Sequence, residues 1–324
     1  DDPRTGWISG LNDQEGREHP TQAGLRIGKK LNERGPHDPF DERLEWDRDG
    51  HYFHYLTKWM QALDAVARAT NEAKYEQWAI ELAKAAHAAF AHRLFPGGPV
   101  RLCWKMSIDL SHPLVPSMGQ HDPLDGLITC RQLQAGAEIF SEIPPTLNLD
   151  TEITELTALC KDMSWETNDP LGIGGLLTDA CRLTQLVALH NLDESNRLEQ
   201  LLDEAAASLA VWIRNAPLQQ AAPYRLAFRE LGLSIGLHAI EKILGTLDRH
   251  AHRFPNHQAL ETHLTNLDHF LPLQENIESF WMQPAHQQSD SWMAHRDINC
   301  VTLATSPVSY THLRAHETNN SISY

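Results

Sequence analysis

A two-helix unit recurs along the chain, and this repetition restricts the fold more than any other feature of the sequence. Each unit pairs a first helix that is apolar around most of its circumference with a second helix that is apolar on one side only. The first helices are expected to begin near residues 52, 122, 173 and 224, so the later units recur about every 51 residues. A helix that is apolar all round must be buried, whereas a striped helix faces solvent on one side. The pattern therefore predicts an all-α fold of stacked helical hairpins.

The bounds of these hairpins follow from the helical spacing of apolar residues between short polar turns. The helices are expected at 52–70 and 73–92, 122–141 and 149–162, 173–190 and 194–215, and 224–247 and 257–270, with a further start at 292–298. Residues 1–50 are rich in Gly, Pro, Asp and Arg and show little periodicity, so they are expected to be mostly loop. Residues 51–306 are expected to form the helical part of the same domain.

Two of the first helices share the tripeptide Asp-Pro-Leu at their start, with Asp122 in one and Asp169 in the other. The two helices also match in letters, because Gly126-Leu-Ile-Thr129 corresponds to Gly175-Leu-Leu-Thr178. An Asp before a helix accepts hydrogen bonds from unpaired backbone amides, and Pro suits the first helical position. Both aspartates are therefore predicted to cap their helices, and a catalytic role is the alternative for Asp122.

Two architectures can bury the apolar helices of such pairs: an open solenoid, or a closed toroid with an inner and an outer ring. Small residues at the start of one first helix, Gly172, Gly174 and Gly175, favour close packing of an inner ring. The long segment 93–121 would suit a loop that covers one mouth of a toroid.

The four hairpins over 52–270, with aromatic and acidic segments before their first helices, resemble the six-hairpin glycosidase-like proteins. This (α/α) toroid group includes glycoside hydrolases and N-acylglucosamine 2-epimerase-type sugar isomerases. The loop Asp2-Pro-Arg-Thr-Gly-Trp7 is also similar to a loop of that group. The resemblance covers about two thirds of the chain and is architectural, since no catalytic signature can be carried over position by position. It implies an (α/α) toroid, incomplete at both ends, and carbohydrate chemistry.

Composition narrows the classes of partner. A formal net charge of −16 argues against nucleic acid and anionic membranes, because both bind a cationic face. No apolar run approaches the roughly 20 residues of a membrane span. The five cysteines are scattered and include no CxxC, which favours reduced thiols and a cytoplasmic location. We expect no metal and no cofactor, and a small-molecule or oligosaccharide substrate; the oligomeric state stays open.

The densest group of candidate site residues lies between Arg43 and His54, just before the first hairpin. Cleavage of a glycosidic bond needs a proton donor and a base, and aromatic rings stack on sugar faces. The predicted catalytic residues here are Glu45, Asp47, Asp49 and His54, and the predicted sugar platforms are Trp46 and Tyr52. The alternative interpretation is structural: Asp49 caps the helix, Asp47 pairs with an arginine and Trp46 belongs to the core.

Further candidates precede other first helices or lie within one. The predicted substrate-binding residues are Trp104, His121, Glu166, His295, Arg296 and Asp297. His238 recurs with Glu230 and Ser234 at intervals of four residues on one helix face, and it is a candidate acid/base for a sugar epimerase, as is His54. The alternatives are a surface salt bridge at 295–297, and a hydrogen-bonded core histidine beside an Arg–Glu pair at His238.

Three functions remain open at this stage. A glycoside hydrolase with paired carboxylates in a central funnel is favoured, and a sugar epimerase that uses histidine is the nearest competitor. The third is a non-catalytic helical-repeat protein that binds a partner on a concave surface.

The C-terminal segment 307–318 resembles a translated sequencing adapter, so 307–324 is interpreted as a non-native tail, and His312 and His316 receive no role. A natural polar tail is the alternative. No signal peptide is visible, and the chain is interpreted as a fragment of a longer reading frame.

Overall fold

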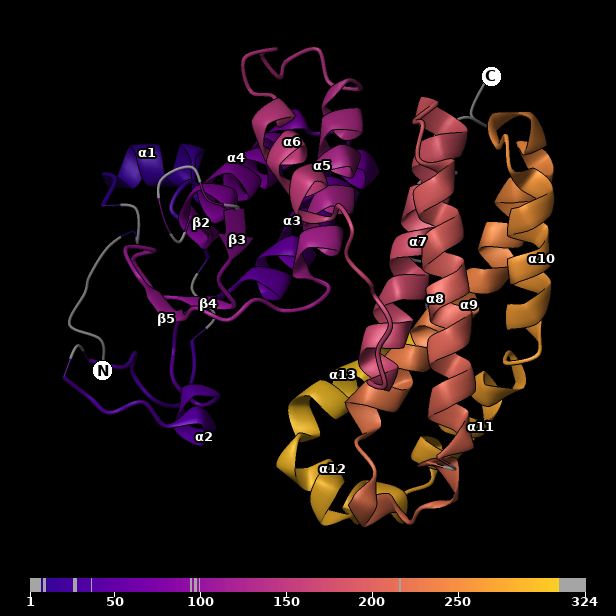
Figure 1. Cartoon of the computed structure of the whole chain (residues 1–324). Coiled ribbons are helices and arrows are strands. Elements are labelled where there is room, and N and C mark those ends of the chain that lie inside the picture. Colours follow the sequence, from indigo (N-terminus) through magenta and orange to yellow (C-terminus); the bar gives the residue numbers. More distant parts are fainter. Residues whose placement is uncertain are drawn as a thin grey trace. The chain divides into compact units, whose positions relative to one another are not determined.

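The computed structural model describes residues 7, 10–25, 28–35, 37–93, 95, 98, 100–215 and 217–308 (Figure 1). Of these residues, 65% are helical and 5% lie in strands, which confirms the all-α prediction. The chain divides into two compact units, Asp1–Met163 and Ser164–Tyr324. The expected loop 2–6 and the tail beyond 308 lie outside the described residues.

The first unit is built from two helical hairpins. Their helices are α3 (Phe53–Thr70) with α4 (Ala73–Phe90), and α5 (Asp122–Ala137) with α6 (Asp150–Leu159). The first helices α3 and α5 pack on each other, and each packs on the second helix of its own pair. The second helices are joined by Lys84 and Glu152, whose Nζ and Oε1 atoms lie 3.3 Å apart. Two short helices, α1 (Asp13–Glu18) and α2 (Glu42–Glu45), precede the hairpins.

Two small antiparallel sheets accompany these hairpins, and the sequence did not predict them. One has the order β1-β4-β5, and the other pairs β2 with β3. The strands are β1 (His51–Tyr52), β2 (Ala91–Arg93), β3 (Val100–Leu102), β4 (Lys105–Met106) and β5 (Pro113–Val115). Strands of two or three residues are too short to show a period of two, so the pattern that identifies strands is missing. They order the segment that was expected to be a long loop.

The second unit repeats the hairpin arrangement. Its helices are α7 (Pro170–His190), α8 (Ser195–Arg214), α9 (Ala227–Arg249), α10 (His257–Asp268), α11 (Pro272–Met282), α12 (Asp290–Ala294) and α13 (Arg296–Thr305). Short 3-10 turns lie at Pro217–Gln219, Ala222–Tyr224, Ala251–Arg253, His286–Gln288 and Ser306–Val308. The first helices α7 and α9 pack along each other, and α8 packs on α7 and α10. Helix α11 was not expected, and the helix predicted at 292–298 is split in two at His295.

The contact between α7 and α9 depends on glycine. A Cβ atom on Gly174 would lie 2.1 Å from the backbone oxygen of Gly232, and one on Gly236 would lie 2.5 Å from the Cα of Gly174. The two backbones therefore touch, as expected for the small residues at this helix start. Gly175 takes no part, because a Cβ there would meet no atom within 4 Å.

None of the described helices is long and apolar enough to cross a membrane. All five cysteines carry free thiols, and Cys300 is the exposed one among them.

Candidate functional site

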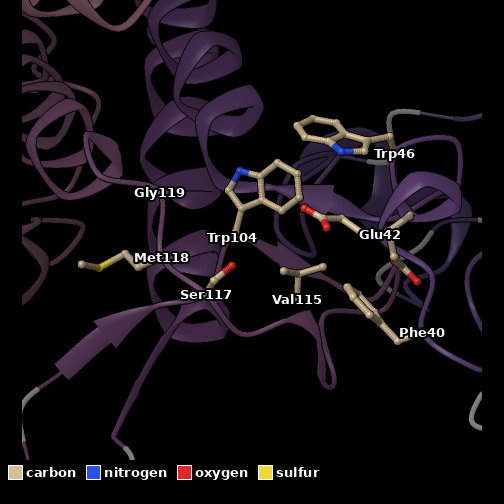
Figure 2. A pocket seen from close by; sticks show the side chains of 9 residues that line it. Phe40, Glu42, Trp46, Trp104, Val115, Ser117, Met118 and Gly119 are labelled. Atoms are coloured by element: carbon tan, nitrogen blue, oxygen red, sulfur yellow. The ribbon is translucent and has the colours of Figure 1, made fainter. Parts of the chain in front are cut away.

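A pocket of about 440 Å³ opens in the first unit (Figure 2). Its lining comes from α2 and the residues around it, from the turn before β4, and from the segment between β5 and α5. The lining residues are Phe40, Glu42, Glu45, Trp46, Trp104, Val115, Ser117, Met118 and Gly119. The pocket therefore lies where α2 meets the small sheet and the start of α5.

Two indole rings form one wall of this pocket. The rings of Trp46 and Trp104 meet edge to face, with centroids 4.6 Å apart and an interplanar angle of 73°. Trp46 is 51% exposed and so presents an apolar face to solvent. Behind Trp104 lie Tyr52, at 5.1 Å between centroids, and His54, at 6.3 Å and nearly parallel. The structure thus brings Trp104 together with three residues predicted from the segment between Arg43 and His54.

Tyr52 supports this wall from inside the core. The side chain is 1% exposed, and its hydroxyl donates to the backbone oxygen of Glu45 at 3.1 Å. Burial, with smaller contributions from Tyr55 and Glu45, raises the pKa of the phenol. A neutral, buried Tyr52 therefore fixes the position of Trp104 and offers no open face for a sugar.

Glu45 and Lys105 fasten α2 to the sheet. The Nζ atom of Lys105 donates to the backbone oxygens of Glu45 and Arg48 at 2.7 and 2.9 Å, and it lies 3.2 Å from Oε2 of Glu45. The other carboxylate oxygen accepts from Arg34 Nε at 2.6 Å. Both side chains of the Lys105–Glu45 pair are buried, and burial lowers the pKa of the lysine while Glu45 opposes that shift. Glu45 therefore carries a structural ion pair on each oxygen.

The two other predicted carboxylates of this segment have contrasting surroundings. Asp49 is 1% exposed, and its Oδ1 accepts from the backbone amides of Gly50 and Gly28 at 2.9 and 3.2 Å. Asp47 is exposed, and among the described residues no donor contacts its carboxylate. Only Asp47 of the three is thus open to solvent, and the catalytic roles of all three stay predictions.

The Asp-Pro-Leu repeat has different roles at its two positions. Asp169 is the N-cap of α7, and its Oδ1 accepts from the amide of Leu171 at 3.1 Å, as predicted. In α5 the N-cap is His121, with no side-chain cap hydrogen bond, and Asp122 is already the first helical residue. The capping prediction is therefore wrong for Asp122, because the helix begins one residue earlier than the Asp-Pro-Leu motif implies and the carboxyl group, buried beside Gly119, makes no cap hydrogen bond.

The sequence pointed to Asp122 mainly as a helix cap, but the structure makes it a candidate acid of the site. It is 7% exposed, and its Oδ2 has no partner with hydrogen-bonding geometry among the described residues. A Cβ on Gly119, which lines the pocket, would lie 2.4 Å from that oxygen, so Asp122 abuts the pocket wall. Burial and the charge of Asp125 raise the pKa of Asp122 to about 7, while Lys58 and the amide of Gly119 oppose the shift.

His54 complements Asp122 at the neighbouring helix start. Burial, followed by the charge of Lys58, lowers the pKa of His54 to about 4, although Asp125 opposes the shift. The imidazole is therefore neutral at neutral pH, and it is a weaker base than an ordinary histidine. The helix starts of α3 and α5 thus hold one carboxyl group that can donate a proton and one neutral imidazole, beside an aromatic pocket.

The remaining predicted residues belong to the second unit. His238 Nε2 lies 3.0 Å from Glu278 Oε1, and the same oxygen accepts from Ser234 and from Ser306, each at 2.6 Å. This arrangement is the hydrogen-bonded histidine that the sequence left as an alternative. The other residues of this unit, Glu166, His295, Arg296 and Asp297, are exposed. Their substrate-binding roles stay predictions.

One group among the described residues brings metal-type ligand atoms together. Asp248, His257 and Glu261 place one such atom each within 4.8 Å of the others. The aspartate is exposed and the other two residues are partly exposed, so a solvated surface cluster explains the arrangement. We assign no metal to it.

No protein-family model, curated protein or solved structure matches the chain.

Proposed function

We propose that the chain is a carbohydrate-active enzyme, most simply a glycoside hydrolase, with its site in the first unit. One observation carries the proposal: a buried carboxyl group with a pKa of about 7 abuts a pocket walled by two indoles. Protonated carboxyl groups at neutral pH are what glycosidic cleavage requires of its acid, and indole faces suit the C–H faces of sugars.

The chemistry divides between two carboxyl groups. Asp122 donates its proton to the glycosidic oxygen as the bond from that oxygen to the anomeric carbon breaks. A carboxylate then takes a proton from the water that attacks the anomeric carbon. Glu42 lines the pocket, and Asp47 is the exposed carboxylate of the neighbouring segment, so these two are the candidates for the base.

The larger architecture belongs to the same proposal. Each unit has first helices packed on each other and second helices outside them, which is how a sector of an (α/α) toroid is built. A sugar substrate is preferred over nucleic acid because the net charge is −16, and the free thiols favour the cytoplasm.

The test is hydrolysis of a panel of oligosaccharides by the full chain and by Asp122→Asn. Loss of the acid should lower turnover by about 10²- to 10⁴-fold. The matched control is Asp169→Asn in the other Asp-Pro-Leu motif, which should retain turnover because asparagine still caps a helix. Release of no sugar from any glycan, or equal activity of Asp122→Asn and the parent chain, would overturn the proposal.

A sugar epimerase is the second candidate, because His54 is a neutral imidazole stacked near Trp104. An epimerase would exchange a sugar C–H proton with solvent deuterium, and His54→Gln would abolish this exchange. Deuterium incorporation without hydrolysis would favour this function. Sugar binding without either reaction would favour the non-catalytic alternative.

A further inference from the structure

Asp125 lies one helical turn after Asp122 and is held by three side chains of one helix. Its Oδ2 accepts from Thr57 Oγ1 at 2.5 Å, and its Oδ1 accepts from Gln61 Nε2 at 3.1 Å. Lys58 Nζ donates to both oxygens, at 3.0 and 3.1 Å. All three donors come from the first turns of α3. Four hydrogen bonds, two of them from a cation, favour the carboxylate form of Asp125.

The spacing places this anion beside the carboxyl group of Asp122, whose Oδ2 has no hydrogen-bond partner among the described residues. Residues three apart on a helix are neighbours on its surface, about 5–6 Å between their Cβ atoms. Two carboxyl groups so close in a buried place do not both ionise readily, so the anchored one keeps its charge and the other keeps its proton. The helix N-terminus acts the other way, because its dipole favours an anion at the first helical residue.

The charged and titratable groups that act on Asp122 come from two helices. Asp125 belongs to the same helix, and Lys58 of α3 is the facing cation that favours the Asp122 anion. His54 of α3 is neutral and contributes no charge in neutral solution. The state of Asp122 thus depends on the balance between one anchored anion and the lysine that pairs with it.

We propose that Asp125 is a positioning residue: anchored by Thr57, Lys58 and Gln61 of α3, it keeps the acidic proton on Asp122. The catalytic consequence rests on the proposed function, since it supplies the hydrolase with its acid. The proton balance itself does not depend on that function, and it is measurable without any substrate.

The experiment follows the carboxyl carbon of Asp122 by NMR during a pH titration of the full chain, with Asp122→Asn used to assign the signal. Asp125→Asn should move the titration midpoint down by about one pH unit, because the neighbouring anion is gone. Lys58→Met should move it up, because the cation that favours the Asp122 anion is gone. Opposite shifts from the two halves of one ion pair are not expected of a purely structural contact, whose loss would disturb the site in one direction.

The matched control is Lys84→Met, which breaks the similar Lys84–Glu152 pair between α4 and α6 and should leave the midpoint unchanged. Equal midpoints, or shifts of the same sign in Asp125→Asn and Lys58→Met, would overturn the inference. If Asp125→Asn fails to fold, an unchanged or lowered midpoint in Lys58→Met suffices to overturn it. Opposite shifts in a chain that hydrolyses no glycan would leave the inference standing and remove the proposed function.

Discussion

At the scale of single residues, the aspartates of the two Asp-Pro-Leu motifs have different roles. Asp169 caps α7 and also contacts Arg229, its Oδ2 lying 2.5 Å from Nη1. Asp122 does neither and is kept in a place where its charge is unfavourable. A buried carboxyl group that makes no cap hydrogen bond and whose pKa is raised costs stability when it ionises, which proteins tolerate mainly at functional sites.

The cost of Asp122 should appear in the pH dependence of stability. Its pKa is about 7 in the folded chain against an ordinary value of 3.8, so the folded state binds more protons between these values. Stability therefore falls as the pH rises from about 4 to about 7, by on the order of 4 kcal/mol for this group alone. Asp122→Asn should lose this dependence and be the more stable chain at pH 7. Denaturant titrations of both chains at pH 4.5 and 7.5 measure the difference, and parallel pH dependence would contradict it.

A second pH-dependent pair lies deeper in the first unit. Glu76 and Asp64 are both fully buried, and a Cβ on Gly136 would lie 2.8 Å from Oε1 of the former and 2.9 Å from Oδ1 of the latter. Burial, with the charge of Asp64, raises the pKa of Glu76 to about 9, while Arg68 opposes the shift. Asp64 is the charged partner, since Arg68 Nε lies 2.8 Å from its Oδ1.

Glu76 should therefore be protonated in the folded chain at neutral pH. Because its folded pKa exceeds its ordinary value of 4.5, its contribution to stability declines as the pH rises from about 4.5 to about 9. Glu76→Gln replaces the protonated group with a neutral one of the same shape, so its unfolding free energy should depend less on pH across this window. Thermal unfolding followed at pH 5, 7 and 9 tests this, and an equally steep decline in the variant would refute it.

At the scale of elements, the contact between α7 and α9 is set by backbone atoms and not by large side chains. Gly174 touches the backbone of α9, whereas the adjacent Gly175 faces open space. Gly174→Ala should destabilise the chain by about 1–3 kcal/mol, because a methyl group cannot fit without separating α7 from α9. Gly175→Ala should instead stabilise it by about 0.5–1 kcal/mol, because alanine is the better helix former. Chemical denaturation of the pair measures both, and similar effects at the two positions would contradict the close approach.

Long elements were predicted from the sequence more accurately than short ones. The long helices α3 and α7, of 18 and 21 residues, carry enough apolar positions to fix both type and place. The strands β1 and β4 have two residues each, and they pair residues more than 50 positions apart, which no local pattern reveals. The unexpected helix α11 follows α10 after a short turn, where a Pro begins it without a capping side chain.

The candidate site was predictable in its aromatic part only. Trp46, Tyr52 and His54 were expected from their density near a helix start, Trp104 was expected from the polar segment between two helices, and the four do lie together. Asp122 was interpreted as a cap because the sequence shows the local motif only. The burial of Asp122 and the position of Asp125 relative to α3 arise from tertiary packing, which the sequence does not show. The sequence alone cannot separate an Asp at the N-cap, as at Asp169, from one at the first helical position without a cap hydrogen bond, as at Asp122.

At the scale of the whole molecule, each unit has its own core and a two-layer arrangement of hairpins. If the hairpins curve into a ring, as proposed, the full chain should be compact in solution. A compact chain of this length has a radius of gyration of about 20 Å. Small-angle X-ray scattering of the monomer should give a value near this, and a clearly larger value would show an extended row of hairpins and contradict the ring.

The edge-to-face pair of Trp46 and Trp104 also gives the pocket an optical signature. Two indoles with centroids 4.6 Å apart and steeply inclined planes couple their electronic transitions, which produces a paired positive and negative band in circular dichroism. The two residues come from segments far apart in the chain, so this band reports the assembled wall and vanishes when either ring moves away. Binding of a ligand between the two rings should therefore weaken this circular dichroism band. The change can be measured without a label and without turnover of a substrate.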